Sequence, residues 1–187
     1  MNDLKLYMCL LGCTPLGRNI EQHDVFFGIG QILKDLVPAI TQFWPEANGK
    51  IHIDAWREVT QVDGYAVQVV QKTEAVENIS RETLFFINLG GYKQNEFEEF
   101  HYKMLAVAED KGTAVQQAKQ TAFYKHTGFK GAESHIDDRY GIDVDDVCEI
   151  SDILPIQLKE QYSIKLSKQL STQEDQLHMG YLKLDKL

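Results

Sequence analysis

The sequence predicts an α+β fold in which one strand–strand–helix–strand–strand unit occurs twice, as a tandem duplication. The sheet is expected to be mostly antiparallel, with the helices packed on one side. Three observations predict this fold: an internal repeat, short apolar runs that end at glycine, and one amphipathic stretch in each copy. One unit of about 75 residues would have only a marginal core. We therefore expect the two copies to pack together within the 187-residue chain.

The repeat is visible without gaps at a shift of 78 residues, where Lys5–Gly30 overlays Thr83–Ala108. After a five-residue insertion the shift becomes 83, which places His52–Asp54 on His135–Asp137. The identical pairs in the first window are Leu6/Leu84, Leu11/Leu89, Gly12/Gly90, Glu21/Glu99 and His23/His101.

The expected boundaries follow from the repeat and from a polar stretch without apolar periodicity at 71–81. The first repeat unit is placed at 1–71, a linker at 72–81 and the second repeat unit at 82–170. Residues 171–187 are expected to form a C-terminal turn and a strand, 176–184, that pairs back across that turn.

Each copy is expected to contribute four strands, because short runs rich in Val, Ile, Phe and Leu end at turn residues. In the third strand, Ile53 and Ala55 should face one side of the sheet, with His52, Asp54 and Trp56 on the other. The predicted strands of the two copies are Leu6–Leu11 and Leu84–Leu89, Asp24–Ile29 and Tyr102–Ala108, Lys50–Val59 and Glu133–Ile142, Tyr65–Val70 and Tyr162–Leu166.

One helix is expected in each copy, starting just after Asp35 and Thr113, which are both favourable N-cap residues. This start would place Pro38 in a first helical turn, where its missing N–H does no harm. The buried core is expected to include eight apolar positions: Leu6, Leu11, Phe27, Ile53, Leu84, Leu89, Leu105 and Ile136.

The composition favours an acidic protein of the cytoplasm. A net charge of −9 without a Lys/Arg block disfavours binding to nucleic acid or to an anionic membrane. An apolar run long enough to span a bilayer and a signal-peptide pattern are both missing from the sequence. Cys9, Cys13 and Cys148 are odd in number and form no C-x-x-C pair, so a disulfide framework is not expected.

Four histidines, each two residues from a carboxylate, form the candidate functional cluster. In the first copy these residues are Glu21, His23, His52 and Asp54, and in the second Glu99, His101, His135 and Asp137. Residues two apart on a strand share a face. Two imidazoles and two carboxylates would then suit a zinc, manganese or non-haem iron site, with His23, His52 and Asp54 as the metal candidates.

Two other interpretations of the cluster remain open. The residues could tie loops to strand ends by hydrogen bonding, which we favour because duplication copies structural ties as readily as active sites. They could also perform metal-free acid–base chemistry, with a carboxylate orienting a neutral imidazole. An organic cofactor is not expected, because the sequence has neither a G-x-G-x-x-G dinucleotide motif nor a phosphate loop.

The sequence resembles the DUF1543 family, a bacterial domain of unknown function that occurs in one or two copies per chain. The resemblance implies a duplicated bacterial cytoplasmic protein and transfers no catalytic residue. The second copy has diverged, since it lacks the tryptophan and the Gly-Tyr pair. The segments that resemble the family are Leu11–Gly12, Ile20–Asp24, His52–Trp56 and Val62–Tyr65, with Leu89–Gly90, Glu99, His101, His135–Asp137 and Asp146 in the second copy.

Together these features predict a non-catalytic binding or interaction protein built from two repeat units. The alternative is a metal-dependent or acid–base enzyme that uses the Glu/His/His/Asp cluster, so enzymatic activity is left open. The expected partner is a small molecule or a protein. Membrane binding is not expected, nucleic acid is disfavoured, and a homodimer is left open.

Overall fold

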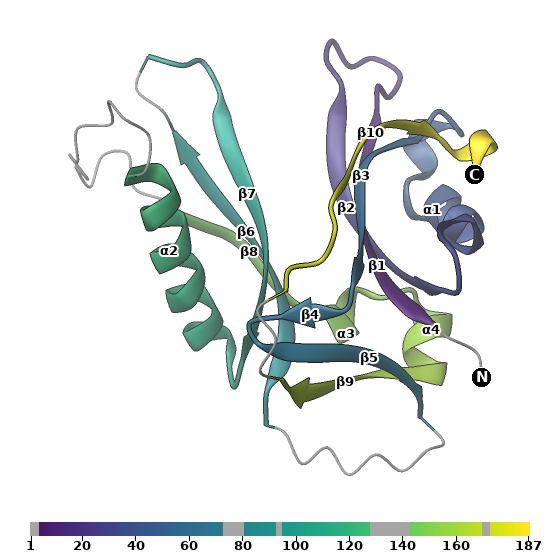
Figure 1. Ribbon diagram of the computed structural model, residues 1–187. Helices are drawn as coiled ribbons and strands as arrows, with labels where there is room; N and C mark the ends of the chain where they lie inside the picture. Colours follow the sequence, from purple (N-terminus) through teal and green to yellow (C-terminus); the bar gives the residue numbers. More distant parts are fainter. Residues whose placement is uncertain (1–3, 73–80, 93–94, 128–142, 170–172) are drawn as a thin grey trace. The chain divides into compact units, whose positions relative to one another are not determined.

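Antiparallel sheets and a few helices form the fold in the computed structural model, which describes residues 4–72, 81–92, 95–127, 143–169 and 173–187. This mixed α+β architecture agrees with the expected fold class. The chain divides into two compact units (Figure 1). The first contains Met1–Asn78 and Ile153–Leu187, and the second contains Ile79–Asp152.

The first unit is built on a four-stranded sheet in the order β10-β3-β1-β2, with every pair antiparallel. Strand β1 lies in the interior of this sheet, which explains its nearly continuous apolar sequence. The strands are β1 (Lys5–Cys13), β2 (Gln22–Gly30), β3 (His52–Val59) and β10 (His178–Lys183).

Short helices cover one face of this sheet. A 3-10 turn, η1 (Leu33–Leu36), runs directly into α1 (Val37–Phe43), and η2 (Pro45–Ala47) follows. Leu36 and Ile40 are buried against Tyr7, Leu11 and other strand residues. As expected, Pro38 lies in the first turn of α1.

The expected N-cap at Asp35 is wrong, because Asp35 lies inside the 3-10 turn and α1 starts two residues later. Its carboxylate instead accepts hydrogen bonds from the backbone N–H groups of Gln31 and Ile32, at 3.0 and 3.1 Å. The carboxylate therefore satisfies amide groups that precede the helical turn.

A second sheet of the first unit has the order β4-β5-β9. Its strands are β4 (Gln61–Val62), β5 (Tyr65–Gln71) and β9 (Tyr162–Lys168), and α4 (Ile156–Gln161) precedes β9. Strand β9 was expected to belong to the second repeat unit. It groups with the first unit because it pairs with β5 along seven residues, from Tyr65↔Lys168 to Gln71↔Tyr162.

The C-terminal strand also differs from the expectation that it pairs back across the 171–175 turn. Strand β10 pairs with β3, so that His178 lies opposite Trp56 and Lys183 opposite His52. A 3-10 turn, η3 (Leu184–Lys186), follows it. Leu182, Leu184 and other tail residues pack against the helix-side core, which fixes β10 to this sheet.

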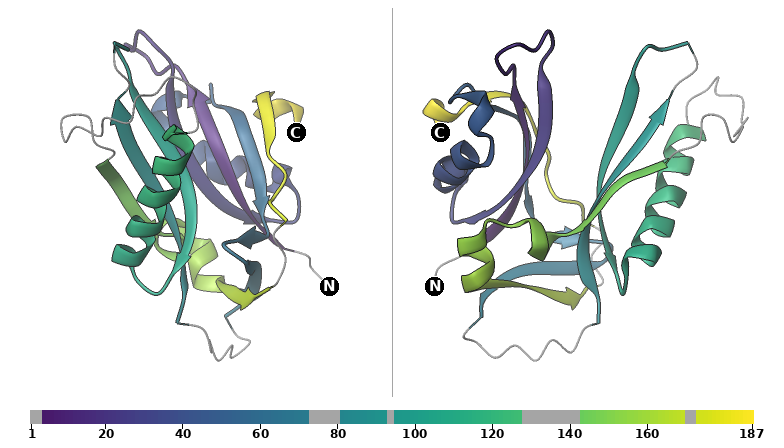
Figure 2. Two further views of the ribbon diagram at one scale, coloured as in Figure 1. Left: turned by 60° about the vertical axis from the view of Figure 1, so that its left-hand side comes forward. Right: turned by 180° about the vertical axis from the view of Figure 1, so that it is seen from behind.

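The second unit contains one antiparallel sheet in the order β7-β6-β8, with α2 on one face (Figure 2). Its elements are β6 (Thr83–Tyr92), β7 (Glu99–Ala108), α2 (Lys111–Thr127), β8 (Asp143–Glu149) and α3 (Ile150–Ile153). Ala114 and Ala118 are buried, and these small side chains let α2 approach the sheet closely.

The start of α2 differs from the expected cap at Thr113. The helix begins at Lys111, and the Asp110 carboxylate accepts hydrogen bonds from the Thr113 backbone N–H at 2.9 Å and from its hydroxyl at 3.1 Å. Asp110 is therefore the capping residue, because its side chain satisfies a first-turn amide group.

The third strand of the second unit differs in position. The expected strand, 133–142, lies outside the described residues, and β8 occupies 143–149. Gly90 lies opposite Asp143 in the β6–β8 register, whereas Gly12 lies opposite His52 in the β1–β3 register. His135, which the sequence aligned with His52, lies outside the described residues, and the residue that β8 places opposite Gly90 is Asp143.

A β-bulge changes the expected alternation along β3. Leu10 pairs with Ala55 but Leu11 pairs with Ile53, so Asp54 is an extra residue on β3. The side-chain pattern shifts by one residue at this point. Ile53 and Trp56 both pack against the helix-side core, so Trp56 does not share a face with His52 as expected.

The expected core agrees with the structure at seven of its eight positions. The eighth, Ile136, lies outside the described residues. Those confirmed as buried are Leu6, Leu11, Phe27, Ile53, Leu84, Leu89 and Leu105. All three cysteines are free. Within the described residues, no helix is long and apolar enough to cross a membrane.

Truncation of Leu6 tests the core. Because Leu6 is buried, Leu6→Ala should lower the free energy of unfolding by about 2–5 kcal/mol through lost burial and a residual cavity. The matched control is Leu16→Ala, at a fully exposed leucine, which should change it by less than about 0.5 kcal/mol. Urea denaturation measures the free energy of unfolding of both variants. Equal changes in the two variants would contradict the burial of Leu6.

The cap of α2 should make stability depend on pH. The hydrogen bonds from Thr113 hold the pKa of the Asp110 carboxyl below its ordinary value of 3.8. A depressed pKa stabilises the folded state above 3.8, and this stabilisation disappears as the pH falls through the lower folded value. The melting temperature of the wild-type protein should therefore be higher than that of Asp110→Ala at pH 7. The difference between the two melting temperatures should shrink towards pH 3. An equal difference at both pH values would contradict the ionised cap.

Candidate functional site

The site is organised around Gly12, near the end of the interior strand β1. In the sheet register Gly12 lies opposite His23 on β2 and opposite His52 on β3. A Cβ atom at Gly12 would lie 2.5 Å from Asp54 Oδ2 and closer still to His52 Nε2. The side chains of β3 therefore occupy the space that any other residue at position 12 would fill.

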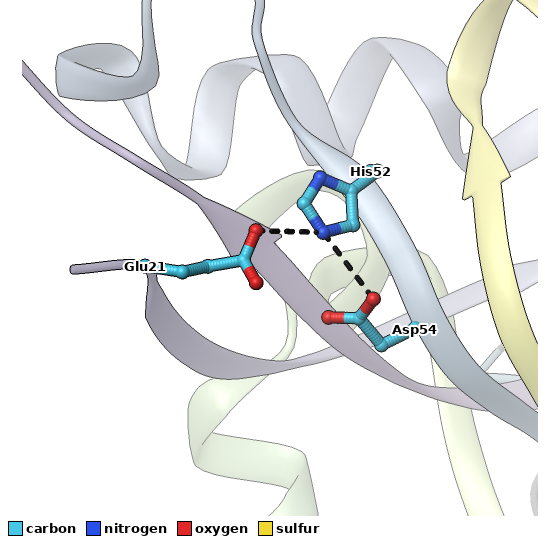
Figure 3. A group of neighbouring side chains, drawn as sticks. All are labelled: Glu21, His52 and Asp54. Carbon is cyan, nitrogen blue, oxygen red and sulfur yellow. Dashed lines mark ion pairs between the residues drawn. The ribbon is translucent and has the colours of Figure 1, made fainter.

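Glu21, His23, His52 and Asp54, the candidate cluster of the first copy, converge at this place. His52 Nε2 lies 3.1 Å from Glu21 Oε1 and 3.2 Å from Asp54 Oδ1 (Figure 3). His23 Nε2 lies 3.2 Å from Asp54 Oδ2 and 3.6 Å from Glu21 Oε2. Each carboxylate therefore faces His52 with one oxygen and His23 with the other.

The four side chains differ in exposure to solvent. The side chain of His52 is 7% exposed and that of Asp54 26%, whereas those of His23 and Glu21 are 41% and 42% exposed. The ring of Tyr181 on β10 covers His52, with ring centroids 4.2 Å apart. The site therefore has a closed side at His52 and an open side at His23.

The polar atoms on the closed side are close together without being hydrogen-bonded. Within the described part of the chain, His52 Nε2 and Asp54 Oδ2 are buried and have no hydrogen-bond partner. His52 Nε2 thus lies close to two carboxylate oxygens, but the angles of these contacts are not those of hydrogen bonds. Both atoms instead make ion-pair contacts, His52 Nε2 with Glu21 and Asp54, and Asp54 Oδ2 with His23. An imidazole nitrogen and carboxylate oxygens are atoms that coordinate divalent cations.

Glu21, His52 and Asp54 also meet the spatial requirement for a metal site. Each offers one ligand atom, and these atoms lie within 4.8 Å of one another. Cys13 also lies on β1, but burial and the negative charge of Glu21 raise the pKa of its thiol. Cys13 therefore stays protonated at neutral pH and is a poor metal ligand.

The second unit has a simpler polar group. His101 Nδ1 lies 3.1 Å from Asp145 Oδ2, and Asn88 Nδ2 lies 3.4 Å from each of these atoms. A Cβ atom at Gly90 would lie 2.6 Å from Asp145 Oδ2, in the same way that Gly12 is confined by Asp54. Glu99 is exposed at the start of β7, without a described contact to this group.

Two of the predicted site residues, His135 and Asp137, lie outside the described residues. Asp145 was not predicted, because a shift of 83 residues aligns Asp54 with Asp137 instead. Two residues at the first site were also missed. Gly12 could have been identified from its place opposite both histidines, once the strand register was known, whereas Tyr181 lies on a strand remote in sequence.

Comparisons with known proteins support the fold and part of the family resemblance. Residues 18–69, which include Glu21, His23, His52 and Asp54, match the family model described as Domain of Unknown Function (DUF1543). The match does not extend into the second unit. No curated protein matches the sequence. The crystal structure of a protein Il1583 from Idiomarina loihiensis is similar with a TM-score of 0.64 and 22% identity, covering 97% of this chain and 99% of that one.

Proposed function

We propose that the first unit is a metal-binding module that holds a divalent cation through Glu21, His52 and Asp54. The observation behind this proposal is that three ligand atoms lie within 4.8 Å of one another while His52 Nε2 has no hydrogen bond among the described residues. The wider expectation of a binding protein remains part of the proposal, with the metal as the bound species.

The distances suit coordination. With metal–ligand bonds of about 2.0–2.2 Å, neighbouring ligands of a tetrahedron or an octahedron lie about 2.8–3.6 Å apart. The contacts of His52 Nε2 with Glu21 and Asp54 are 3.1 and 3.2 Å. One imidazole nitrogen and two carboxylate oxygens suit zinc, manganese or iron(II).

Charge also favours a cation over hydrogen bonding alone. One imidazole nitrogen can share one proton, yet two carboxylates approach His52 Nε2. A divalent cation neutralises both carboxylates and can be coordinated by all three groups at once. The geometry thus supports the metal interpretation more strongly than the structural ties that the sequence favoured.

An enzyme is the second candidate function. His23 is on the open side, and its Nε2 lies 3.2 Å from Asp54 Oδ2. An exposed imidazole beside a carboxylate can transfer protons to a ligand at a metal ion. The candidate reaction class is metal-assisted acid–base chemistry on a small molecule.

We also propose that the two units arose by tandem duplication. The support is that β1 and β6 each pair with a bulged strand, at Leu10/Leu11 and at Asn88/Leu89, a shift of 78 residues in both cases. Asp143 then takes the place of His52 opposite the glycine. The second copy would thereby have lost its central imidazole, and metal binding is assigned to the first copy alone.

The remaining proposals concern the cellular compartment and the kind of partner. We place the protein in the bacterial cytoplasm, since its three cysteines are free, as is usual in a reducing compartment. Its partner is proposed to be a small molecule or a protein, not a membrane, and its charge of −9 disfavours nucleic acid. A homodimer is compatible with this proposal.

Metal binding can be measured directly. Untagged protein should bind Zn²⁺ tightly in calorimetry, and His52→Ala should weaken the tightest site at least tenfold because it removes the only buried nitrogen ligand. Binding should also weaken as the pH is lowered, because protons compete with the metal for the ligands. The matched control is His101→Ala, at the histidine opposite Gly90, which should bind Zn²⁺ like wild type. Wild-type protein that binds no divalent cation, or His52→Ala binding unchanged, would refute the proposal.

Gly12→Ala tests the space beside the ligands. The new methyl group would displace His52 and Asp54, so Zn²⁺ affinity should fall at least tenfold and the melting temperature should drop. Gly90→Ala is the matched control, since it crowds Asp145 in the second unit and should lower the melting temperature with Zn²⁺ affinity unchanged. Wild-type affinity in Gly12→Ala would contradict the proposed geometry.

A further inference from the structure

We infer that the site binds a second divalent cation, held by His23 together with the outer oxygens of Glu21 and Asp54. The inference rests on the proposed function, since the first cation lies between the inner oxygens and His52. The ligand atoms form two sets that share no atom. One set is His52 Nε2 with Glu21 Oε1 and Asp54 Oδ1, and the other is His23 Nε2 with Glu21 Oε2 and Asp54 Oδ2.

Both carboxylates are therefore in the position of bridging ligands. A carboxylate that bridges two metal ions gives one oxygen to each, and ions in two-metal sites lie about 3.5–4 Å apart. The distances from His23 Nε2 to its two oxygens, 3.2 and 3.6 Å, are again those of neighbouring ligands on one ion. A site built for one ion would need only one oxygen from each carboxylate.

The burial of one oxygen in the second set bears on the inference. Asp54 Oδ2, the oxygen that faces His23, is buried and without a hydrogen-bond partner among the described residues. With only the inner cation bound, the neighbour of this oxygen would be His23 Nε2, at 3.2 Å. A cation between Asp54 and His23 gives it a ligand bond.

Exposure and charge set the order of binding. The inner set contains His52, whose side chain is 7% exposed, whereas His23 and Glu21 are 41% and 42% exposed. One divalent cation already neutralises the two carboxylates, so the second ion leaves a charge of +2 on the cluster. We therefore expect the second ion to bind more weakly, and its excess charge to attract an oxyanion such as phosphate from the open side.

The test is a titration of the untagged full chain with Mn²⁺, followed by calorimetry and by electron paramagnetic resonance. The expected result is two equivalents in two steps, with the second at least tenfold weaker and accompanied by a spin-coupled two-manganese spectrum. His23→Ala should lose the second equivalent and keep the first within about threefold of its wild-type affinity. His101→Ala, at a histidine of equal exposure beside Asp145, should keep both.

Three outcomes would overturn the inference in different ways. A single equivalent in wild type, unaffected by His23→Ala, removes the second cation and leaves the proposed function standing. A second equivalent that survives His23→Ala but is lost in His101→Ala belongs to the second unit. Binding of no Mn²⁺ and no Zn²⁺ by a folded wild-type protein removes the proposed function and this inference together.

Discussion

The space left by the missing side chain of Gly12 is the constraint on which the site depends. Gly12 lies on the interior strand β1, between the two histidine-bearing strands, and the His52 ring and Asp54 carboxylate occupy the volume of its absent Cβ. Glycine in a strand is unfavourable by roughly 0.5–1 kcal/mol relative to alanine. In return, the missing side chain leaves space beside β1. Four polar side chains from the flanking segments lie there.

A second constraint is the bulge in β3, which serves the core and the site at once. The extra residue, Asp54, lets Ile53 and Trp56 both reach the helix-side core although they are three residues apart. It also places the Asp54 carboxylate beside Gly12, next to the ring of His52. With regular alternation these core and site residues could not have been divided between the two faces in this way.

Much of this arrangement could be predicted from the sequence where the information is local. Apolar runs identified β1, β2, β6 and β7, and the Glu-x-His and His-x-Asp spacings identified all four residues of the first cluster. In the second unit the sequence did not identify Asp145 as the partner of His101, because the repeat does not reveal how many residues lie between α2 and β8. The pairing of β10 with β3, and with it the contact of Tyr181 and His52, depends on packing between segments more than 120 residues apart.

The two units differ in what surrounds the aspartate beside the strand glycine. In the second unit an Asn88 amide donates to Asp145, whose carboxylate also meets His101, so this carboxylate has partners. In the first unit Leu10 stands where Asn88 would correspond, and Asp54 Oδ2 has no hydrogen bond within the described residues. Under the proposed duplication, one copy would have kept two imidazoles beside its aspartate, while the other gained an amide donor that ties its carboxylate in place. A donor amide at Asp145 and a bound cation at Asp54 would be alternative ways to stabilise an aspartate beside the glycine. The copy without the amide is therefore the one in which a cation has the most to contribute.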